Sequence, residues 1–83
     1  METTQGTYML IKTNGEITYA DSMNLKDMQN FVEGYIEMLI RDEQEFIFCE
    51  EGLLKKFKHN KIASDMAKIS LVGNVIVSKH RGE

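Results

Sequence analysis

The sequence predicts an α+β domain with a mostly antiparallel sheet of four to six strands, one main helix and one short helix. Short runs of β-branched and aromatic residues recur along the chain with turn residues between them, and one segment has its apolar residues at helical spacing. A chain of 83 residues has room for a single domain. The expected order is β-β-α-β-β-(β)-α-β, with the helices on one face of the sheet.

The first expected element is a hairpin. Residues 8–20 contain two β-rich runs separated by Asn14-Gly15, a dipeptide typical of a two-residue type I′ turn. Such a turn places Leu10 opposite Tyr19, so that one face of the hairpin is expected to pack against the core. The side chains expected on that core face are Tyr8, Leu10, Ile17 and Tyr19.

A helix is expected to follow the hairpin. Asn24 is suited to cap its N-terminus, and Asp27 lies in the first turn, where negative charge is favoured. Gly34 suits the C′ position that ends many helices. The apolar stripe of this helix is expected to consist of Leu25, Met28, Phe31 and Val32.

The rest of the chain predicts further strands and the short helix. The strands are expected at 35–40, 45–49, 53–57 and 70–77, and the short helix at 61–68. The strand at 53–57 has the weakest pattern because of its two lysines, and the last strand is expected to be largely buried. Asn60 is expected to cap the short helix. Gly73-Asn74 indicates a bulge or a close backbone approach, with a hairpin turn as the alternative.

Composition and charge limit the possible classes of protein. The net charge of −3 argues against binding to double-stranded nucleic acid, which needs a basic surface. Cys49 is the only cysteine, which excludes an intrachain disulfide and favours a cytoplasmic location. No apolar run is long enough to cross a membrane, and no signal peptide is expected. Residues 1–6 and 79–83 are expected to be flexible.

No pattern in the sequence predicts catalysis, a metal or a cofactor. Cys49, His59 and His80 are far apart in the chain and do not form a ligand motif. Two glutamates follow Cys49, the opposite of the positive environment that activates a thiol. No phosphate-binding glycine loop is present. We therefore expect a protein that is not an enzyme.

Several polar residues could instead bind a ligand. Tyr35 supplies a stacking surface, and Lys58 and Asn60 supply the charge and hydrogen bonds that a nucleotide would use. Glu37 is expected to point away from the core on its strand. The alternative interpretation is that these are ordinary solvent-facing residues.

Four segments resemble the DUF3846 family. Residues 32–37 are similar to its "GGYIE" junction, 48–54 to its "cNEEGkl" turn, 57–63 to its "lppNr" segment and 70–77 to its closing strand. The prolines of that pattern are absent here, and Glu50 stands where asparagine is common. The resemblance implies a small accessory protein of unknown function from bacteria, phages or other mobile elements. If the family shares a site, the matched polar and glycine positions would belong to it, namely Gly34, Tyr35, Glu37, Glu51, Gly52, Asn60 and Gly73. The alternative for the three glycines is a structural role at a helix end, a turn and a bulge.

Two functions follow as hypotheses. The first is a small non-enzymatic accessory protein that binds a host protein or self-associates, because the six methionines and the possible free sheet edges suit protein contacts. The second is a protein that binds or sequesters a small nucleotide-type ligand through Tyr35, Glu37, Glu51, Lys58 and Asn60.

Overall fold

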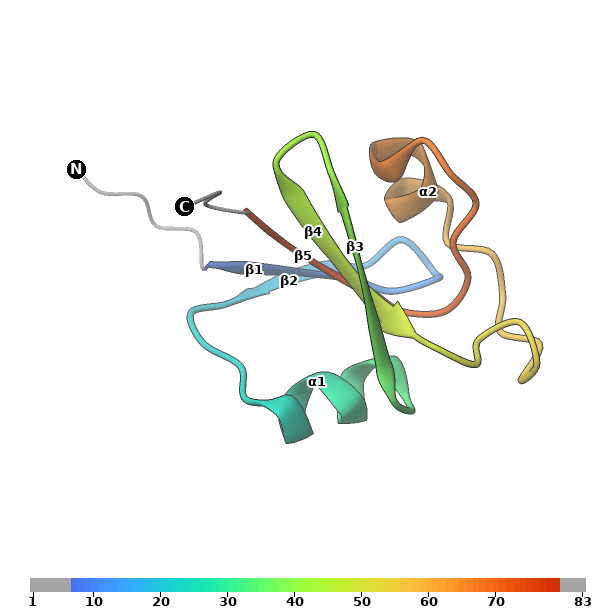
Figure 1. Ribbon diagram of the computed structural model, residues 1–83, viewed down its shortest axis with the longest axis horizontal. Helices are drawn as coiled ribbons and strands as arrows, with labels where there is room; N and C mark the ends of the chain where they lie inside the picture. Colours follow the sequence, from blue (N-terminus) through green and yellow to red (C-terminus); the bar gives the residue numbers. More distant parts are fainter. Residues whose placement is uncertain (1–6, 80–83) are drawn as a thin grey trace.

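A computed structural model describes residues 7–79 and confirms the α+β class (Figure 1). Its elements are β1 (Tyr8–Ile11), β2 (Ile17–Ala20), α1 (Leu25–Val32), β3 (Ile36–Arg41), β4 (Gln44–Cys49), α2 (Lys61–Ala67) and β5 (Val75–Lys79). The five strands form one antiparallel sheet in the order β2-β1-β5-β4-β3. Lys79 ends β5, whereas the other residues expected to be flexible, 1–6 and 80–83, lie outside the described residues.

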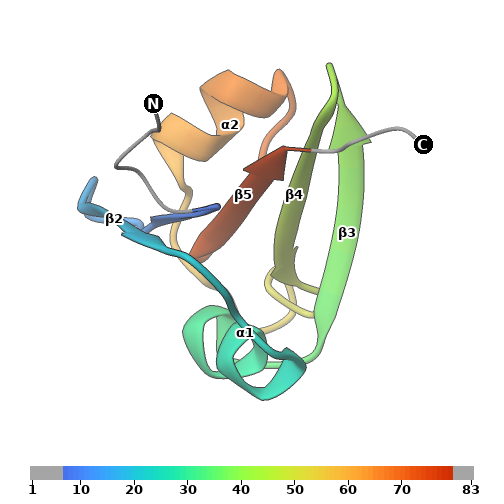
Figure 2. The ribbon, with the colours of Figure 1, turned by 90° about the vertical axis from the view of Figure 1, so that its left-hand side faces the viewer.

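The two helices cover opposite faces of the sheet, so the prediction that they share one face is wrong (Figure 2). Ile47 and Ile76 pack on the α1 side, and their neighbours in the strands, Phe46 and Val75, pack on the α2 side. Successive side chains of a strand point to opposite faces. Because β4 and β5 are apolar at successive positions, both faces of the sheet need a cover.

The first hairpin has a three-residue turn instead of the predicted type I′ turn. The Lys12 N–H donates to the Glu16 carbonyl (2.9 Å), and the Gly15 N–H donates to the Lys12 carbonyl (3.0 Å). Only Gly15 of this turn has a positive φ, 94°, which is the geometry of a turn that ends in a bulge. The Asn14 side chain accepts from the Glu16 N–H (2.9 Å) and stabilises the longer turn.

The longer turn shifts the strand register by one residue. Leu10 lies opposite Thr18 rather than Tyr19. A shift of one residue exchanges the faces of a strand. Tyr8 and Leu10 pack on the α1 side as predicted. Ile17 and Tyr19 lie on the opposite face, with Ile11 and Met9, and are exposed, so the predicted core face is wrong for the β2 residues.

The second hairpin contains the two-residue turn. Asp42 and Glu43 connect β3 to β4 with φ values of 52° and 64°, and Arg41 pairs with Gln44 on either side of them. Two successive positive φ values define the type I′ turn, which favours Asn-Gly. Here two residues with side chains adopt a conformation that is unfavourable for them.

Exchanging this turn for the favoured dipeptide is expected to stabilise the domain. The Asp42→Asn/Glu43→Gly variant should raise the free energy of unfolding by about 1 kcal/mol, because glycine has no side chain to strain at positive φ. Urea denaturation measures the change. Glu43→Ala keeps a Cβ at the same φ, so an equal gain in that control would contradict the explanation.

Helix α1 begins as predicted and ends one residue earlier. Asn24 Oδ1 accepts from the Asp27 N–H (2.8 Å), and the Asn24 N–H donates to Asp27 Oδ2 (3.4 Å), which completes a capping box. The left-handed residue at its end is Glu33 (φ 68°) and not Gly34. Leu25 is 57% exposed, so its assignment to the apolar stripe is wrong.

The segment between β4 and β5 differs from the prediction at two places, and one is the last strand, which begins at Val75 rather than at residue 70. Residues 53–56 form successive turns instead of a strand, and Phe57 has no regular structure, whereas Asn60 caps α2 as predicted. Gly73 (φ 79°) precedes β5, and its N–H donates to the Lys58 carbonyl (2.7 Å). This confirms the close backbone approach at Gly73.

No helix among residues 7–79 has the length and apolar character needed to cross a membrane.

Candidate functional site

The open edge of β3 is the most distinctive surface of the described residues. β3 lies at one end of the sheet, and Figure 2 shows no strand beyond it. Ile36 packs against the core on the α1 side, but the next two side chains on that face are not part of this core. Met38 is 49% exposed and Ile40 is 50% exposed. The edge therefore presents apolar side chains together with unpaired backbone groups.

The pairing of β3 with β4 defines which backbone groups face outward. The Glu50 N–H donates to the Tyr35 carbonyl (2.8 Å), so this pair is hydrogen-bonded. Hydrogen-bonded and non-hydrogen-bonded pairs alternate along an antiparallel ladder, and the register is continuous from Ile36 to Arg41. The N–H and C=O groups of Ile36, Met38 and Ile40 therefore point to the open edge.

This edge lacks several devices that commonly prevent strand addition. β3 contains no lysine, proline or bulge, and its six residues each pair with one residue of β4. Its two charged side chains, Glu37 and Arg41, lie on the α2 side with Leu39. The other edge strand, β2, has only four residues.

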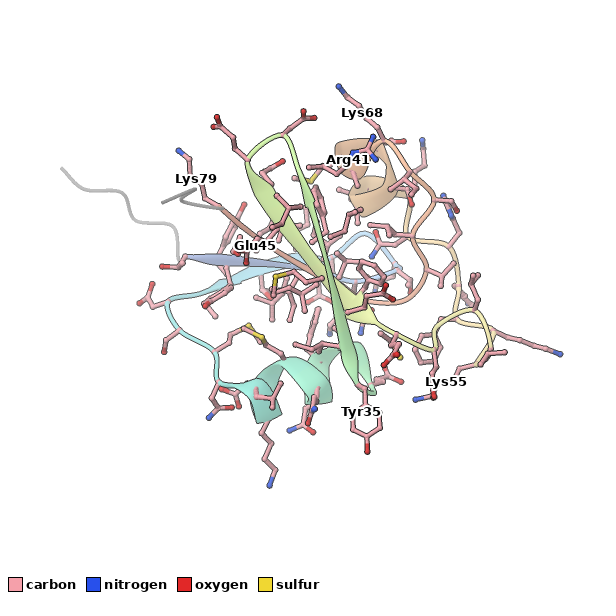
Figure 3. All side chains as sticks on the ribbon, in the orientation of Figure 1. Tyr35, Arg41, Glu45, Lys55, Lys68 and Lys79 are labelled. Atoms are coloured by element: carbon pink, nitrogen blue, oxygen red, sulfur yellow. The ribbon has the colours of Figure 1, made fainter. Side chains whose placement is uncertain are left out.

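A second candidate site is a hollow where α1 turns into β3, with a volume of about 370 Å³. The last turn of α1 and the loop after β4 line it, and Tyr35 and Glu51 lie within it. Tyr35 is 69% exposed, and Figure 3 shows its side chain pointing away from the sheet at the end of β3 opposite Arg41. We call this hollow the corner pocket.

Lys55 binds the main chain at the corner pocket. Its Nζ donates to the Glu33 carbonyl (2.9 Å), and the same ammonium lies 5.9 Å from the centre of the Phe57 ring. A cation is favoured at a helix C-terminus, and α1 has no basic residue in its own last turn. A Cβ at Gly34 would lie 2.8 Å from that Nζ and 2.7 Å from Cys49 Sγ, so glycine permits this arrangement.

The structure brings together only part of the predicted ligand site. Tyr35 and Glu51 share the corner pocket. Lys58 lines an adjacent hollow next to Gly73, and Glu37 lines a third one beside Cys49 and Val72. The five predicted residues therefore do not surround one ligand.

Asn60 is a structural residue, and its prediction as a ligand-binding residue is wrong. It is 1% exposed. Its Oδ1 accepts from the Ala63 N–H (3.1 Å), and its Nδ2 donates to the carbonyls of Ile11 (3.0 Å) and Gly73 (2.9 Å). Both ends of the amide are thus used inside the domain.

Comparison with known proteins gives no match. No family model, no curated protein and no solved structure matches this chain. The resemblance to the DUF3846 family therefore stays a prediction. Within residues 7–79, no group of three His, Cys, Asp or Glu side chains could hold a metal ion.

The sequence alone did not identify the β3 edge or Lys55. The alternation of apolar and charged residues in 36–41 could have predicted the two faces of this strand. It puts Met38 and Ile40 on one face and Glu37 and Arg41 on the other. That this strand lies at the end of the sheet depends on the strand order. The contact of Lys55 with Glu33 joins residues 22 positions apart and has no local signal.

Proposed function

We propose that this chain is a non-enzymatic interaction module that binds another polypeptide along the edge of β3. The observation that carries the proposal is an unprotected six-residue edge strand with Met38 and Ile40 exposed beside it. An added strand would gain main-chain hydrogen bonds from the outward groups and apolar contacts from these two side chains.

The proposal includes a small accessory role in the cytoplasm. A free buried thiol at Cys49 is compatible with a reducing compartment. The resemblance to DUF3846 supports an accessory protein encoded by a phage or another mobile element. Neither the thiol nor the resemblance requires the protein to have a catalytic group.

The corner pocket gives less support to the alternative, a small nucleotide-type ligand. Tyr35 could stack on a base there. The nearest cation, Lys55, already donates to the Glu33 carbonyl, and Lys58 lies in a different hollow. A phosphate in the corner pocket would therefore compete with the end of α1 for its cation.

A proline on each edge strand tests the proposed function. The Ile40 N–H faces outward, so Ile40→Pro removes a donor from the edge without removing a bond to β4. Tyr19→Pro is the matched control on β2, where the register makes the Tyr19 N–H face outward as well. Circular dichroism checks that both variants are folded.

The wild-type protein and Tyr19→Pro are each immobilised. Both are expected to bind the same polypeptides, which are either proteins from a lysate or a second copy of the chain. Crosslinks between the bound polypeptide and the immobilised protein should map to β3. Ile40→Pro is expected to lose these polypeptides. Equal retention by all three proteins would show that recognition does not use the β3 edge.

A further inference from the structure

The order of residues along β3 suggests a partner for its open edge. Residues 37–41 read Glu-Met-Leu-Ile-Arg, which has apolar residues around Leu39 and charges of opposite sign at equal distances from it. Resting on the proposed function, we propose that the polypeptide bound by β3 is β3 of a second copy of this chain. The two strands run antiparallel with Leu39 at the two-fold axis, and the five strands of each copy join into one sheet of ten.

The backbone of β3 permits this register. In a hydrogen-bonded antiparallel pair, the N–H and C=O groups of the two opposite residues point toward each other. Each residue whose backbone groups point to the open edge must therefore lie opposite another such residue. With Leu39 at the axis, Met38 faces Ile40 of the second copy, and both residues have their N–H and C=O groups at the open edge. The symmetry produces the same pair twice.

Charge complementarity selects this register from its neighbours. Glu37 lies opposite Arg41 of the second copy in a non-hydrogen-bonded pair, where Cα atoms are only about 4.5 Å apart. A shift by two residues in one direction puts Glu37 opposite Leu39, so the pair with Arg41 is lost. A shift in the other direction puts Glu37 opposite Glu43, which places like charges together.

Neither charge has a partner of opposite sign within its own strand. Four residues along a strand span about 13 Å, so Glu37 and Arg41 of one copy are too far apart to pair. In the described part of the chain, no ion pair involves either side chain. The second copy supplies both missing partners at once.

The apolar side chains pair on the other face. Met38 and Ile40 point to the α1 side, where each is about half exposed. In the proposed dimer, Met38 lies opposite Ile40 of the second copy, and the reciprocal pair follows by symmetry. Four exposed apolar side chains thus cover one another on the face opposite the ion pairs.

Charge reversal tests this register. Glu37→Arg and Arg41→Glu each replace two attractive contacts with two repulsive ones, so each single variant is expected to weaken the dimer about tenfold or more. A mixture of the two single variants restores opposite charges in both contacts and is expected to form a heterodimer. The double variant Glu37→Arg/Arg41→Glu is expected to dimerise like the wild type. Sedimentation equilibrium at low salt measures all four samples.

Two further variants test whether the dimer uses the charges and the edge of β3. Lys61→Glu makes the same change in net charge as Arg41→Glu but lies on α2, and it is expected to leave the dimer intact. Ile40→Pro is expected to abolish the dimer. A wild-type chain that stays monomeric at about 1 mM overturns the self-pairing, as does a dimer that is insensitive to both single reversals. Capture of a different polypeptide by β3 would then still support the proposed function.

Discussion

Replacing Asn60 with alanine is expected to lower the free energy of unfolding by about 3–5 kcal/mol. The cap of α2 contributes about 1 kcal/mol of this loss. The rest comes from the buried carbonyls of Ile11 and Gly73, which lose the Nδ2 donor that both of them use. At about 0.05–0.15 kcal/mol per residue, a domain of this size has a free energy of unfolding of about 4–12 kcal/mol, so the variant should lose a large fraction of its stability and melt at a much lower temperature.

Two further variants separate the roles of Asn60. Asn24→Ala removes the exposed cap of α1 and is expected to cost only about 1 kcal/mol. Asn60→Asp keeps the capping oxygen but places a carboxylate oxygen near the carbonyls of Ile11 and Gly73. Urea denaturation should find Asn60→Asp nearly as unstable as Asn60→Ala. A cost no larger than that of Asn24→Ala would show that the two carbonyls do not need Nδ2.

Replacing Gly73 with alanine is expected to cost about 2–4 kcal/mol. Its φ of 79° is unfavourable for a residue with a Cβ. That Cβ would also lie 2.7 Å from Phe57 Cδ2, well inside normal contact distance, and 3.4 Å from both Cβ and Cγ of Phe57. Either the ring or the bond from the Gly73 N–H to the Lys58 carbonyl must move. Thermal and urea denaturation measure the loss.

Gly15 provides the matched control for this prediction. Its φ of 94° is also positive, but a Cβ there would meet only Ile62 Cδ1 at 4.0 Å. Gly15→Ala should therefore cost about 1 kcal/mol, which is the backbone contribution alone. In a Phe57→Ala background, the cost of Gly73→Ala should fall to a similar value. If the two glycine substitutions lower the free energy of unfolding equally in the wild-type background, the contact with Phe57 is not the cause of the loss at Gly73.

Local signals predicted the parts of the fold that local interactions determine. Asn24 and Asn60 cap their helices as expected, and the alternation of Phe46 and Phe48 with Ile47 gives the two faces of β4 correctly. The turn types were not predictable in the same way. Asn14-Gly15 has the best type I′ sequence, but the Asn14 side chain stabilises a longer turn. The type I′ turn forms at the polar dipeptide after Arg41 instead.

The site depends on longer-range information. Tyr35 and Glu51 meet in the corner pocket because the Tyr35 carbonyl accepts from the Glu50 N–H, which fixes the loop after β4 beside the start of β3. The apolar residues at Met38 and Ile40 resemble core residues in sequence. Their exposure follows only from the position of β3 at the end of the sheet, which no local pattern encodes.

The order of the strands has a consequence for the growing chain on the ribosome. β5 lies at the centre of the sheet, between β1 and β4, although it is the last of the five strands to be synthesised. Until β5 emerges, the β1–β2 and β3–β4 hairpins are separate ribbons, and β1 and β4 each have one unpaired edge, the one that β5 will occupy. Nascent chains that stop before Val75 would therefore present four strand edges instead of two, which makes them targets for chaperones and for mispairing during translation.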